Sequence, residues 1–472
     1  MDQHTFNKTI LREYDIRGIF KKDLNLIDAL YLGKSFATLL KKNNFKNVVV
    51  GYDGRSSSIK IEKKLIEGLI SKGIQVYRIG IVPTPLLYYS MYSKKLNSGI
   101  MITGSHNPPE YNGFKMLLKN KSIVGKDILD LAKISSKGKF SPNKKGKVKK
   151  ISIANKYLIF LKNLAKVKKN IKIAWDPGNG SSGEIISKLT KIITGKHYVI
   201  NQKIDGNFPA HHPDPTVPKN LKQLIGLVKK KKCDLGFAFD GDGDRLGVID
   251  NKGRIIFADK IVAFLAKDVL KNKPKSKIIL DIKSSQSVFN EIKKLGGNPI
   301  FWKTGHSLIK KKMKETKAIF AGEMSGHIFF ADEYFGFDDA IYASIRFLNL
   351  YSDIKKPLSI IFDGMEKSYN TPELRFDSTE TEKFLIVNKL KKILKDEKKR
   401  FTSIDGVRFT INEGWWLVRA SNTQNIIVAR CESSSKENLI KVKLNLKKYL
   451  KKCSFDIPKF WLFSFYIYNL LI

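Results

Sequence analysis

One pattern occurs three times along the chain: a short apolar strand, then a polar loop, then an amphipathic helix. The expected strands are residues 48–50, 173–175 and 278–280, and they run into the loops GYDGR, DPGNGSSGE and DIKSSQS. Later in each segment a second expected strand ends in another polar loop. Strand–helix–strand connections imply parallel strands with their loops at one edge of the sheet. We therefore expect three similar α/β domains, each a mixed sheet flanked by helices.

After about residue 370 the pattern changes. The stretches DGVRFTI, GWWLVRA and NIIVARCE read as closely spaced strands, and a lysine-rich helix is expected near residues 436–450. This predicts a fourth domain of the α+β class. We place the four domains at 1–150, 151–255, 256–370 and 371–455, with an apolar tail at 456–472. Residues 137–150 (KGKFSPNKKGKVKK) have the composition of a linker.

The chain of 472 residues carries a formal net charge of +43, from 87 Lys and Arg against 44 Asp and Glu. Such a charge raises the possibility of nucleic-acid binding. The lysines are however scattered along helical stretches as KK and KKK, and no zinc-finger, basic-zipper or RNA-recognition pattern accompanies them. Charge runs of this kind are typical of solvated faces. We expect no nucleic-acid partner, and a positive field favours a phosphorylated substrate.

The cysteines and the two ends of the sequence indicate the cellular compartment of the protein. Cys233, Cys431 and Cys453 are too few and too far apart for a disulfide framework or a CxxC metal site. The first residues contain no apolar secretion signal, so we predict a cytoplasmic protein. The apolar run at 460–472 is shorter than the roughly 20 residues that span a bilayer. Docking of this run on a domain or subunit, in a monomer or homodimer, is preferred over attachment to a membrane surface.

The stretch TGSHNPPEYNGFK places Ser105 directly after an expected strand at 98–102, on a loop rich in turn-forming residues. Ligands of open α/β sheets bind at this end of the strands. One alternative is a turn serine that only satisfies nearby backbone groups. Another is a hydrolase nucleophile with His106 as its base, but no GxSxG motif is present.

The stretch DGDGDR places Asp240, Asp242 and Asp244 at alternate positions with glycines between them. Mg²⁺ prefers such carboxylates, completed by phosphate or substrate oxygens. An EF-hand is excluded because its sixth and twelfth positions would be Arg245 and Asn251. A purely structural loop is disfavoured because three unpaired carboxylates would repel one another.

A serine near a divalent cation suits phosphoryl transfer, because cations neutralise the developing phosphate charge. The candidate partners of Ser105 are Lys115, Arg245 and His106. The GKS at 33–35 lacks the first P-loop glycine and a preceding strand, so no ATP site is expected. The phosphoryl group is then expected to come from the enzyme itself.

Three further loops carry polar groups. GEMSGH offers Glu323, Ser325 and His327, which suit sugar hydroxyls. RASNT, which follows an expected strand, has a phosphate-binding composition. KTGHS places a lysine and His306 just before a helix start, where anions are favoured.

Together these loops resemble the α-D-phosphohexomutase family, in particular its bacterial phosphomannomutase/phosphoglucomutase type, from YDIRG at residue 14 to beyond RASNT. The resemblance implies four domains around a central cleft and a phosphoserine at Ser105. It also implies a reaction that interconverts hexose 6-phosphate and hexose 1-phosphate through hexose 1,6-bisphosphate, which also serves as activator. Mg²⁺ would be bound by Asp240, Asp242, Asp244 and the phosphoserine.

The resemblance also implies roles for further residues. Glu323 and Ser325 would hold sugar hydroxyls, and Lys115 and His306 are candidates for proton transfer. The substrate's distal phosphate would be bound by Arg419, Ser421, Asn422 and Thr423. Other residues expected to line the cleft are Tyr14, Arg17, Lys283 and His306.

The chain departs from the family pattern at Gln424 and Asn425, and in its apolar tail. Met324 within GEMSGH indicates the mannose/glucose class of the family. It does not decide between mannose phosphate and glucose phosphate as the substrate. Two other functions stay open at this point. A phosphatase would use Ser105 as its nucleophile, and a basic nucleic-acid-binding protein would rest on the charge alone.

Overall fold

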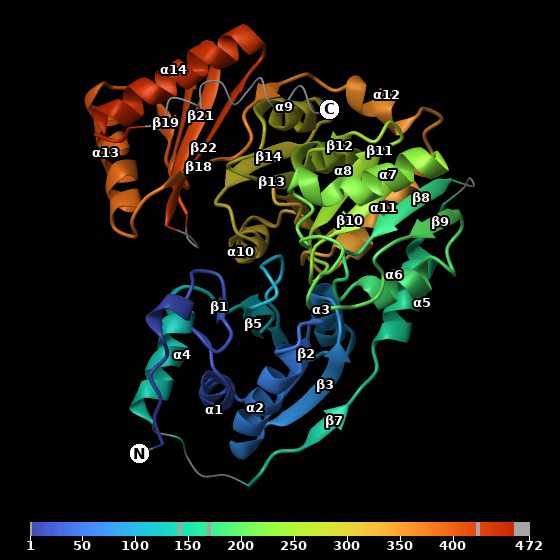
Figure 1. Ribbon diagram of the computed structural model, residues 1–472, viewed down its shortest axis with the longest axis vertical. Helices are drawn as coiled ribbons and strands as arrows, with labels where there is room; N and C mark the ends of the chain where they lie inside the picture. The colour runs from blue at the N-terminus through green and yellow to red at the C-terminus, as the bar shows by residue number, and fades with distance from the viewer. Residues whose placement is uncertain (1, 139, 141–143, 168–170, 422–424, 457–472) are drawn as a thin grey trace.

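The computed structural model describes residues 2–138, 140, 144–167, 171–421 and 425–456. Four sheets follow one another along this chain, and we name the parts built on them domains I to IV. Figure 1 shows domain I at the bottom, domains II and III stacked beside each other above it, and domain IV at the upper left. The predicted order of three α/β units and one α+β unit is present.

Domain I contains a seven-stranded sheet in the order β1-β5-β4-β2-β3-β7, with β6 paired to β5. Its elements are β1 (Ile16–Ile19), α1 (Leu26–Lys42), β2 (Asn47–Tyr52), α2 (Ser58–Ser71), β3 (Gln75–Ile81), α3 (Thr84–Ser93), β4 (Ser98–Ile102), β5 (Tyr111–Leu118), β6 (Lys121–Ser122), α4 (Lys126–Lys137) and β7 (Val148–Lys150). Helix α1 begins at a capping box between Asn25 and Asp28. The GKS sequence lies inside this helix, so it is not a P-loop.

Domains II and III have smaller sheets in the orders β12-β11-β10-β8-β9 and β14-β13-β15-β16. The elements of domain II are α5 (Ala154–Leu164), β8 (Lys172–Asp176), α6 (Gly183–Leu189), β9 (Lys196–Val199), α7 (Lys222–Lys231), β10 (Leu235–Phe239), β11 (Leu246–Asp250) and β12 (Ile255–Ile256). Those of domain III are α8 (Ala258–Asn272), β13 (Lys277–Asp281), α9 (Gln286–Lys294), β14 (Asn298–Trp302), α10 (His306–Thr316), β15 (Phe320–Gly322), β16 (Ile328–Phe330), α11 (Ala340–Ser352) and α12 (Leu358–Asp363).

The three α/β sheets share one four-strand unit. In domain I it is β3-β2-β4-β5, in domain II β9-β8-β10-β11 and in domain III β14-β13-β15-β16. The first three strands of each unit are parallel and the last is antiparallel to its neighbour. The sequence-based interpretation found two strands per segment and missed β3, β9 and β14. Each of these is an outer strand of its unit, and few of its side chains are fully buried.

The described part of the expected linker includes a strand. Residues Val148–Lys150 pair in parallel with β3, although all three side chains are exposed. The pairing therefore rests on main-chain hydrogen bonds, which a side-chain pattern cannot reveal.

Domain IV has a six-stranded sheet in the order β17-β22-β21-β20-β19, with β18 paired to β22. Its elements are β17 (Tyr369–Asn370), β18 (Leu374–Asp377), α13 (Glu382–Asp396), β19 (Phe401–Thr402), β20 (Val407–Ile411), β21 (Gly414–Ala420), β22 (Ile426–Ser433) and α14 (Lys436–Lys452). The sheet and the two helices bury a core around Trp416. The predicted apolar tail from residue 457 onward lies outside the described residues.

The hydrophobic cores show how the domains are joined. Domains II and III share one large core with α3 of domain I, and the rings of Phe237 and Phe347 lie 5.6 Å apart within it. Domain IV packs on domain III through Trp415, which clusters with Ile282, and through Arg408, which donates to the carbonyls of Ile282 at 2.7 Å and Ser284 at 2.9 Å. The Arg408 guanidinium also lies 3.7 Å from the Trp415 ring centroid. None of the helices in the described part of the chain is long and apolar enough to cross a membrane.

Candidate active site

The three predicted chemical loops occupy equivalent positions in their domains. The Ser105 loop connects β4 to β5, the DGDGDR loop connects β10 to β11, and the GEMSGH loop connects β15 to β16. Each therefore joins the third parallel strand of its unit to the antiparallel strand. The repeated topology delivers one loop from each domain to a common site, and the contacts below bring them together.

Ser105 is buried and has a left-handed backbone with φ of 50°, a conformation that non-glycine residues rarely adopt. Its amide donates to Oγ1 of Thr103 at 2.7 Å. Its hydroxyl lies 3.1 Å from Oδ2 of Asp240 and 3.3 Å from Nδ1 of His106. The serine is thus held against the aspartate loop of domain II.

Asp240, Asp242 and Asp244 are fully buried, and one oxygen from each lies within 4.8 Å of the others. Oδ1 of Asp240 accepts from the amides of Asp244 and Arg245, which curls the loop. Among the described residues, Oδ1 of Asp242 and Oδ1 of Asp244 have no hydrogen-bond partner. Converging buried oxygens with free lone pairs could hold a metal ion, and an all-oxygen set suits a hard cation.

Lys115 of β5 also reaches this loop. Its Nζ lies 2.7 Å from Oδ2 of Asp242 and 2.5 Å from Oδ2 of Asp244, and Thr84 donates to the same Asp242 oxygen. Burial and the neighbouring aspartates raise the pKa of Asp240 well above its ordinary value. Burial also opposes ionisation of Asp242, but Lys115 together with hydrogen bonds from Thr84 and Asp240 outweighs it and lowers the pKa of Asp242. Two of the three carboxylates that we expected to be unpaired, Asp242 and Asp244, therefore share a lysine from another domain.

Domain III contributes two histidines. His327 lies with Nε2 3.3 Å from Nε of Arg245 and with Nδ1 3.1 Å from Oδ2 of Asp338. His306 stacks on His327 at a centroid distance of 5.3 Å. Burial lowers the pKa of His306 to about 4, so its imidazole is neutral near pH 7.

The remaining predicted residues belong to domains I, III and IV. Glu323 is buried and accepts from the amide of Gly305 at 2.6 Å. The hydroxyl of Tyr14 donates to the carbonyl of Thr304 at 2.9 Å, and Arg17 donates to the carbonyl of Gly104 at 3.0 Å and to Oδ1 of Asn107 at 2.8 Å. Ser325 is half-buried on the GEMSGH loop.

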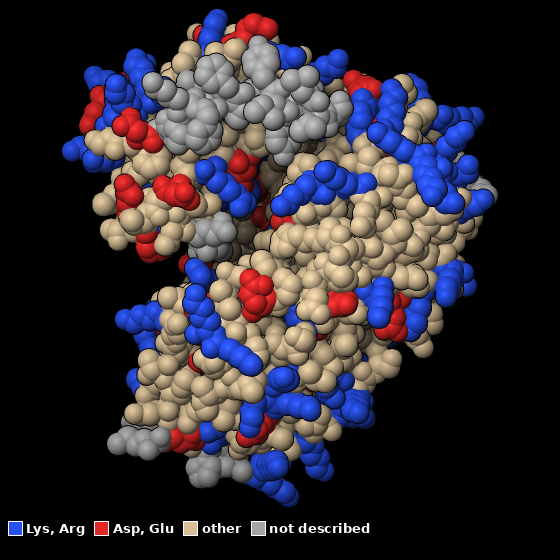
Figure 2. All heavy atoms as spheres, viewed as in Figure 1, with Lys and Arg blue, Asp and Glu red and all other residues tan. Residues whose placement is uncertain are grey.

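In domain IV, Arg419 is buried at the end of β21, with Nη2 3.0 Å from Oδ2 of Asp405. Lys283 lies 3.2 Å from Oε2 of Glu373, and this lysine lowers the pKa of Glu373 to about 2. Ser421 is buried. Asn422 and Thr423 lie outside the described residues. Figure 2 shows a notch in the surface between domain IV and domain I.

Models of the phosphoglucomutase/phosphomannomutase domains match the chain in succession: the α/β/α domains I, II and III at residues 8–140, 155–253 and 257–369, and the C-terminal domain at residues 373–447. The chain belongs to the phosphoglucomutase/phosphomannomutase family. The predicted fold, family and enzyme class, an isomerase that transfers phosphoryl groups, are confirmed.

Curated relatives cover nearly the whole chain. It is 40% identical over 454 residues to the phosphomannomutase/phosphoglucomutase of Pseudomonas aeruginosa, which covers 96% of this chain and 98% of the relative. It is 38% identical to a phosphoglucomutase of Neisseria gonorrhoeae over 95% of this chain and 98% of the relative.

A solved structure agrees with the fold. A phosphoglucomutase/phosphomannomutase family protein from Burkholderia thailandensis superposes with a TM-score of 0.89 at 35% identity, covering 95% of this chain and 98% of the other. This phosphoglucomutase/phosphomannomutase family member thus has the arrangement of a solved relative along almost its full length.

Several residues at the site were missed by the sequence-based interpretation. Asp53 and Arg55 hold the Ser105 loop. Thr84 donates to Asp242, Asp338 lies beside both histidines, and Asp405 pairs with Arg419. The GYDGR motif was available as a signal for the first two, because it follows β2 at the same sheet edge as the Ser105 loop.

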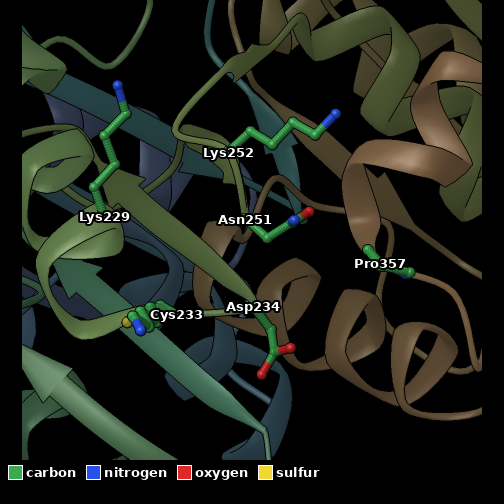
Figure 3. A pocket seen from close by; sticks show the side chains of 7 residues that line it. Lys229, Cys233, Asp234, Asn251, Lys252 and Pro357 are labelled. Carbon is green, nitrogen blue, oxygen red and sulfur yellow. The ribbon is translucent and has the colours of Figure 1, made fainter.

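A hollow elsewhere on the surface takes no part in this site. It is lined by residues of domain II together with Pro357 at the start of α12. Figure 3 shows that Lys229 and Lys252 extend away from Cys233 and Asp234 rather than toward a common centre. The site residues gather instead where domains I, II and III meet.

Proposed function

We propose that this family member interconverts hexose 6-phosphate and hexose 1-phosphate by way of a phosphoserine at Ser105 and a hexose 1,6-bisphosphate. The observation that carries the proposal is the 3.1 Å contact between the Ser105 hydroxyl and Asp240. It joins a nucleophilic hydroxyl to a carboxylate cluster that suits a divalent cation. The basic groups of Lys115, Arg245 and Arg17 lie beside the same loops.

Asp240, Asp242 and Asp244 would hold Mg²⁺, together with an oxygen of phosphorylated Ser105. When bound, the cation neutralises charge that develops on the phosphoryl group during transfer. The fit rests on the all-oxygen donor set and on the two carboxylate oxygens that lack partners among the described residues.

The first transfer breaks the bond between Oγ of Ser105 and phosphorus and forms a bond from phosphorus to the free sugar hydroxyl. The proton of that hydroxyl must leave to a base, for which neutral His306 is a candidate. The bisphosphate then turns over and returns its other phosphoryl group to Ser105, so phosphoserine is regenerated. His106, Lys115 and Arg245 would stabilise or orient the transferring group.

The sugar and the distal phosphate would lie toward domains III and IV. Glu323 and Ser325 suit sugar hydroxyls, because one oxygen of buried Glu323 has no partner among the described residues. Arg419, with Ser421, Asn422 and Thr423, would bind the distal phosphate. The other residues proposed to line this part of the cleft are Tyr14, Arg17, Lys283, His306 and His327.

The names of the relatives include both phosphomannomutase and phosphoglucomutase, so we propose mannose and glucose phosphates as substrates. The test is a coupled assay with mannose 1-phosphate, glucose 1-phosphate and glucosamine 1-phosphate, each with Mg²⁺ and primed by hexose 1,6-bisphosphate. Isomerisation of mannose or glucose phosphate without release of inorganic phosphate is expected. Rapid release of phosphate without isomerisation would indicate a phosphatase and contradict the proposal.

A further inference from the structure

The Ser105 loop depends on contacts from outside itself. Its serine has a left-handed backbone, and the carbonyls of Ser105, Asn107, Pro108 and Tyr111 accept hydrogen bonds from a side chain outside the loop. Buried carbonyls require hydrogen-bond partners, and strained backbone persists only where its surroundings over-determine it. The residue that supplies these partners therefore decides where the Ser105 hydroxyl lies.

That residue is Arg55, whose guanidinium is fully buried. Nη2 donates to the carbonyls of Ser105 at 2.8 Å and Asn107 at 2.6 Å. Nη1 donates to the carbonyl of Tyr111 at 3.0 Å and to that of Pro108. Nε donates to Oδ2 of Asp53 at 3.0 Å. An arginine side chain has five N–H donors, and here every one has an acceptor. Four of the acceptors are carbonyls, three in the Ser105 loop and one at Tyr111, the first residue of β5.

Asp53 holds the Arg55 side chain in place through its Nε atom. Its Oδ2 also accepts from Oγ1 of Thr103 at 2.8 Å and from the amide of Gly104 at 3.1 Å, and its Oδ1 accepts from Ser58 at 2.6 Å. The carboxylate thus ties Arg55 to the strand end that leads into the serine. Both side chains are buried, and charge-assisted bonds are among the stronger hydrogen bonds in proteins.

Domain II closes over the same arginine. The ring of Phe208 lies 5.0 Å from the guanidinium carbon, and a Cβ atom at Gly206 would lie 2.3 Å from the Cα of Arg55. At Gly241, in the aspartate loop, a Cβ atom would lie 2.5 Å from the carbonyl oxygen of Ser105. The loop is therefore clamped between Arg55 and the domain that carries the aspartates.

We propose that Arg55 is a positioning residue for phosphoryl transfer: it holds the Ser105 loop by three of its carbonyls and that of Tyr111, and so aims the hydroxyl at the metal loop. This rests on the proposed function for its effect on the reaction, but not for its effect on the loop. Lysine cannot replace it, because three donors on one nitrogen cannot reach five acceptors spread around a planar fork.

The test compares Arg55→Lys with Arg78→Lys, a matched control in domain I whose arginine pairs with Glu62 away from the loop. For Arg55→Lys, kcat is expected to fall about 100-fold, because a misplacement near 1 Å has that effect. KM for the hexose phosphate should stay near wild type, since the residues proposed to bind it are unchanged. Amide hydrogen exchange across residues 103–111 should rise about tenfold and stay unchanged in the rest of domain I.

A second variant distinguishes loss of the guanidinium group from misfolding of the protein. Arg55→Ala should regain part of its kcat when millimolar guanidinium is added, whereas Arg78→Ala should not respond. Unchanged kcat and loop exchange in Arg55→Lys would overturn the proposal, as would faster exchange spread over all of domain I. If wild type accepts no phosphoryl group from hexose 1,6-bisphosphate, the proposed function fails, and the exchange data still decide the role of Arg55.

Discussion

The hydroxyl of Ser105 and the carboxylate of Asp240 lie 3.1 Å apart, although 135 residues separate them in the chain. They belong to equivalent loops of two repeated domains, each placed after the third parallel strand of its unit. The contact explains why a serine and an aspartate cluster, each ambiguous alone, form one site. A phosphoryl group on Ser105 would add negative charge beside three carboxylates, which a divalent cation would offset.

Asp242→Asn should weaken Mg²⁺ binding and slow turnover by about 10-fold to 100-fold. The variant loses one charged metal ligand and one partner of Lys115. The measurement is kcat as a function of Mg²⁺ concentration. Asp234→Asn is the control in the same domain, since Asp234 lies at the hollow that is separate from the site. Identical Mg²⁺ dependence in wild type and Asp242→Asn would show that the aspartates form a structural turn and do not bind the metal.

Arg419→Ala should raise KM and lower kcat/KM by about 10-fold to 100-fold, the loss expected for a charge-assisted contact to phosphate of about 1.5 to 3 kcal/mol. It should also release more hexose 1,6-bisphosphate per turnover, because the intermediate is held less firmly. Arg375→Ala is a control in domain IV, because the side chain of Arg375 is 60% exposed. Wild-type kinetics in Arg419→Ala would mean that domain IV does not bind the phosphate.

Asp339 is expected to make stability depend on pH. Burial raises the pKa of this carboxyl to about 6, although the hydroxyls of Tyr157 and Tyr334 donate to it. A raised carboxyl pKa means that the folded state binds a proton more tightly than the unfolded state. The stabilisation is therefore present below about pH 4 and is lost as pH rises to about 6, by about 3 kcal/mol in all.

Urea unfolding of wild type and Asp339→Asn at pH values from 4 to 7 measures this effect. The stability of wild type relative to the variant should fall across that range and then level off. A constant difference between the two proteins would show that Asp339 has an ordinary pKa. Asp332→Asn, which removes a partner of Arg346, is the comparison for a general loss of a buried acid.

The domain order could be predicted because each unit repeats a local signal. An apolar strand such as β4 (SGIMI), which is fully buried in the structure, can be recognised from the sequence. The same holds for the amphipathic helix that follows β2. The outer strands β3, β9 and β14 were missed because their mixed burial blurs the apolar pattern. Strand β7 was missed because only its backbone pairs.

The sequence also singled out the Ser105 loop and the glycine-spaced aspartates, and the structure brings these two loops together. Their roles as nucleophile and metal ligands stay predictions. The partners of the two loops could not be predicted. Arg55 lies 50 residues before Ser105 and acts through backbone carbonyls, and Lys115 reaches the aspartates across a domain boundary. The first contact depends on how two loops of domain I fold against each other and the second on how two domains pack, and local patterns encode neither.

The most direct measurement of the central claim is a single turnover of the purified phosphoenzyme with hexose 6-phosphate, followed by intact-protein mass spectrometry, with Ser105→Ala beside it. We predict that wild type carries one phosphoryl group, passes it to the sugar to give hexose 1,6-bisphosphate and regains it at the end of the cycle. Ser105→Ala should carry none and lose most turnover while still binding hexose phosphate. Near-normal turnover by Ser105→Ala would contradict the account.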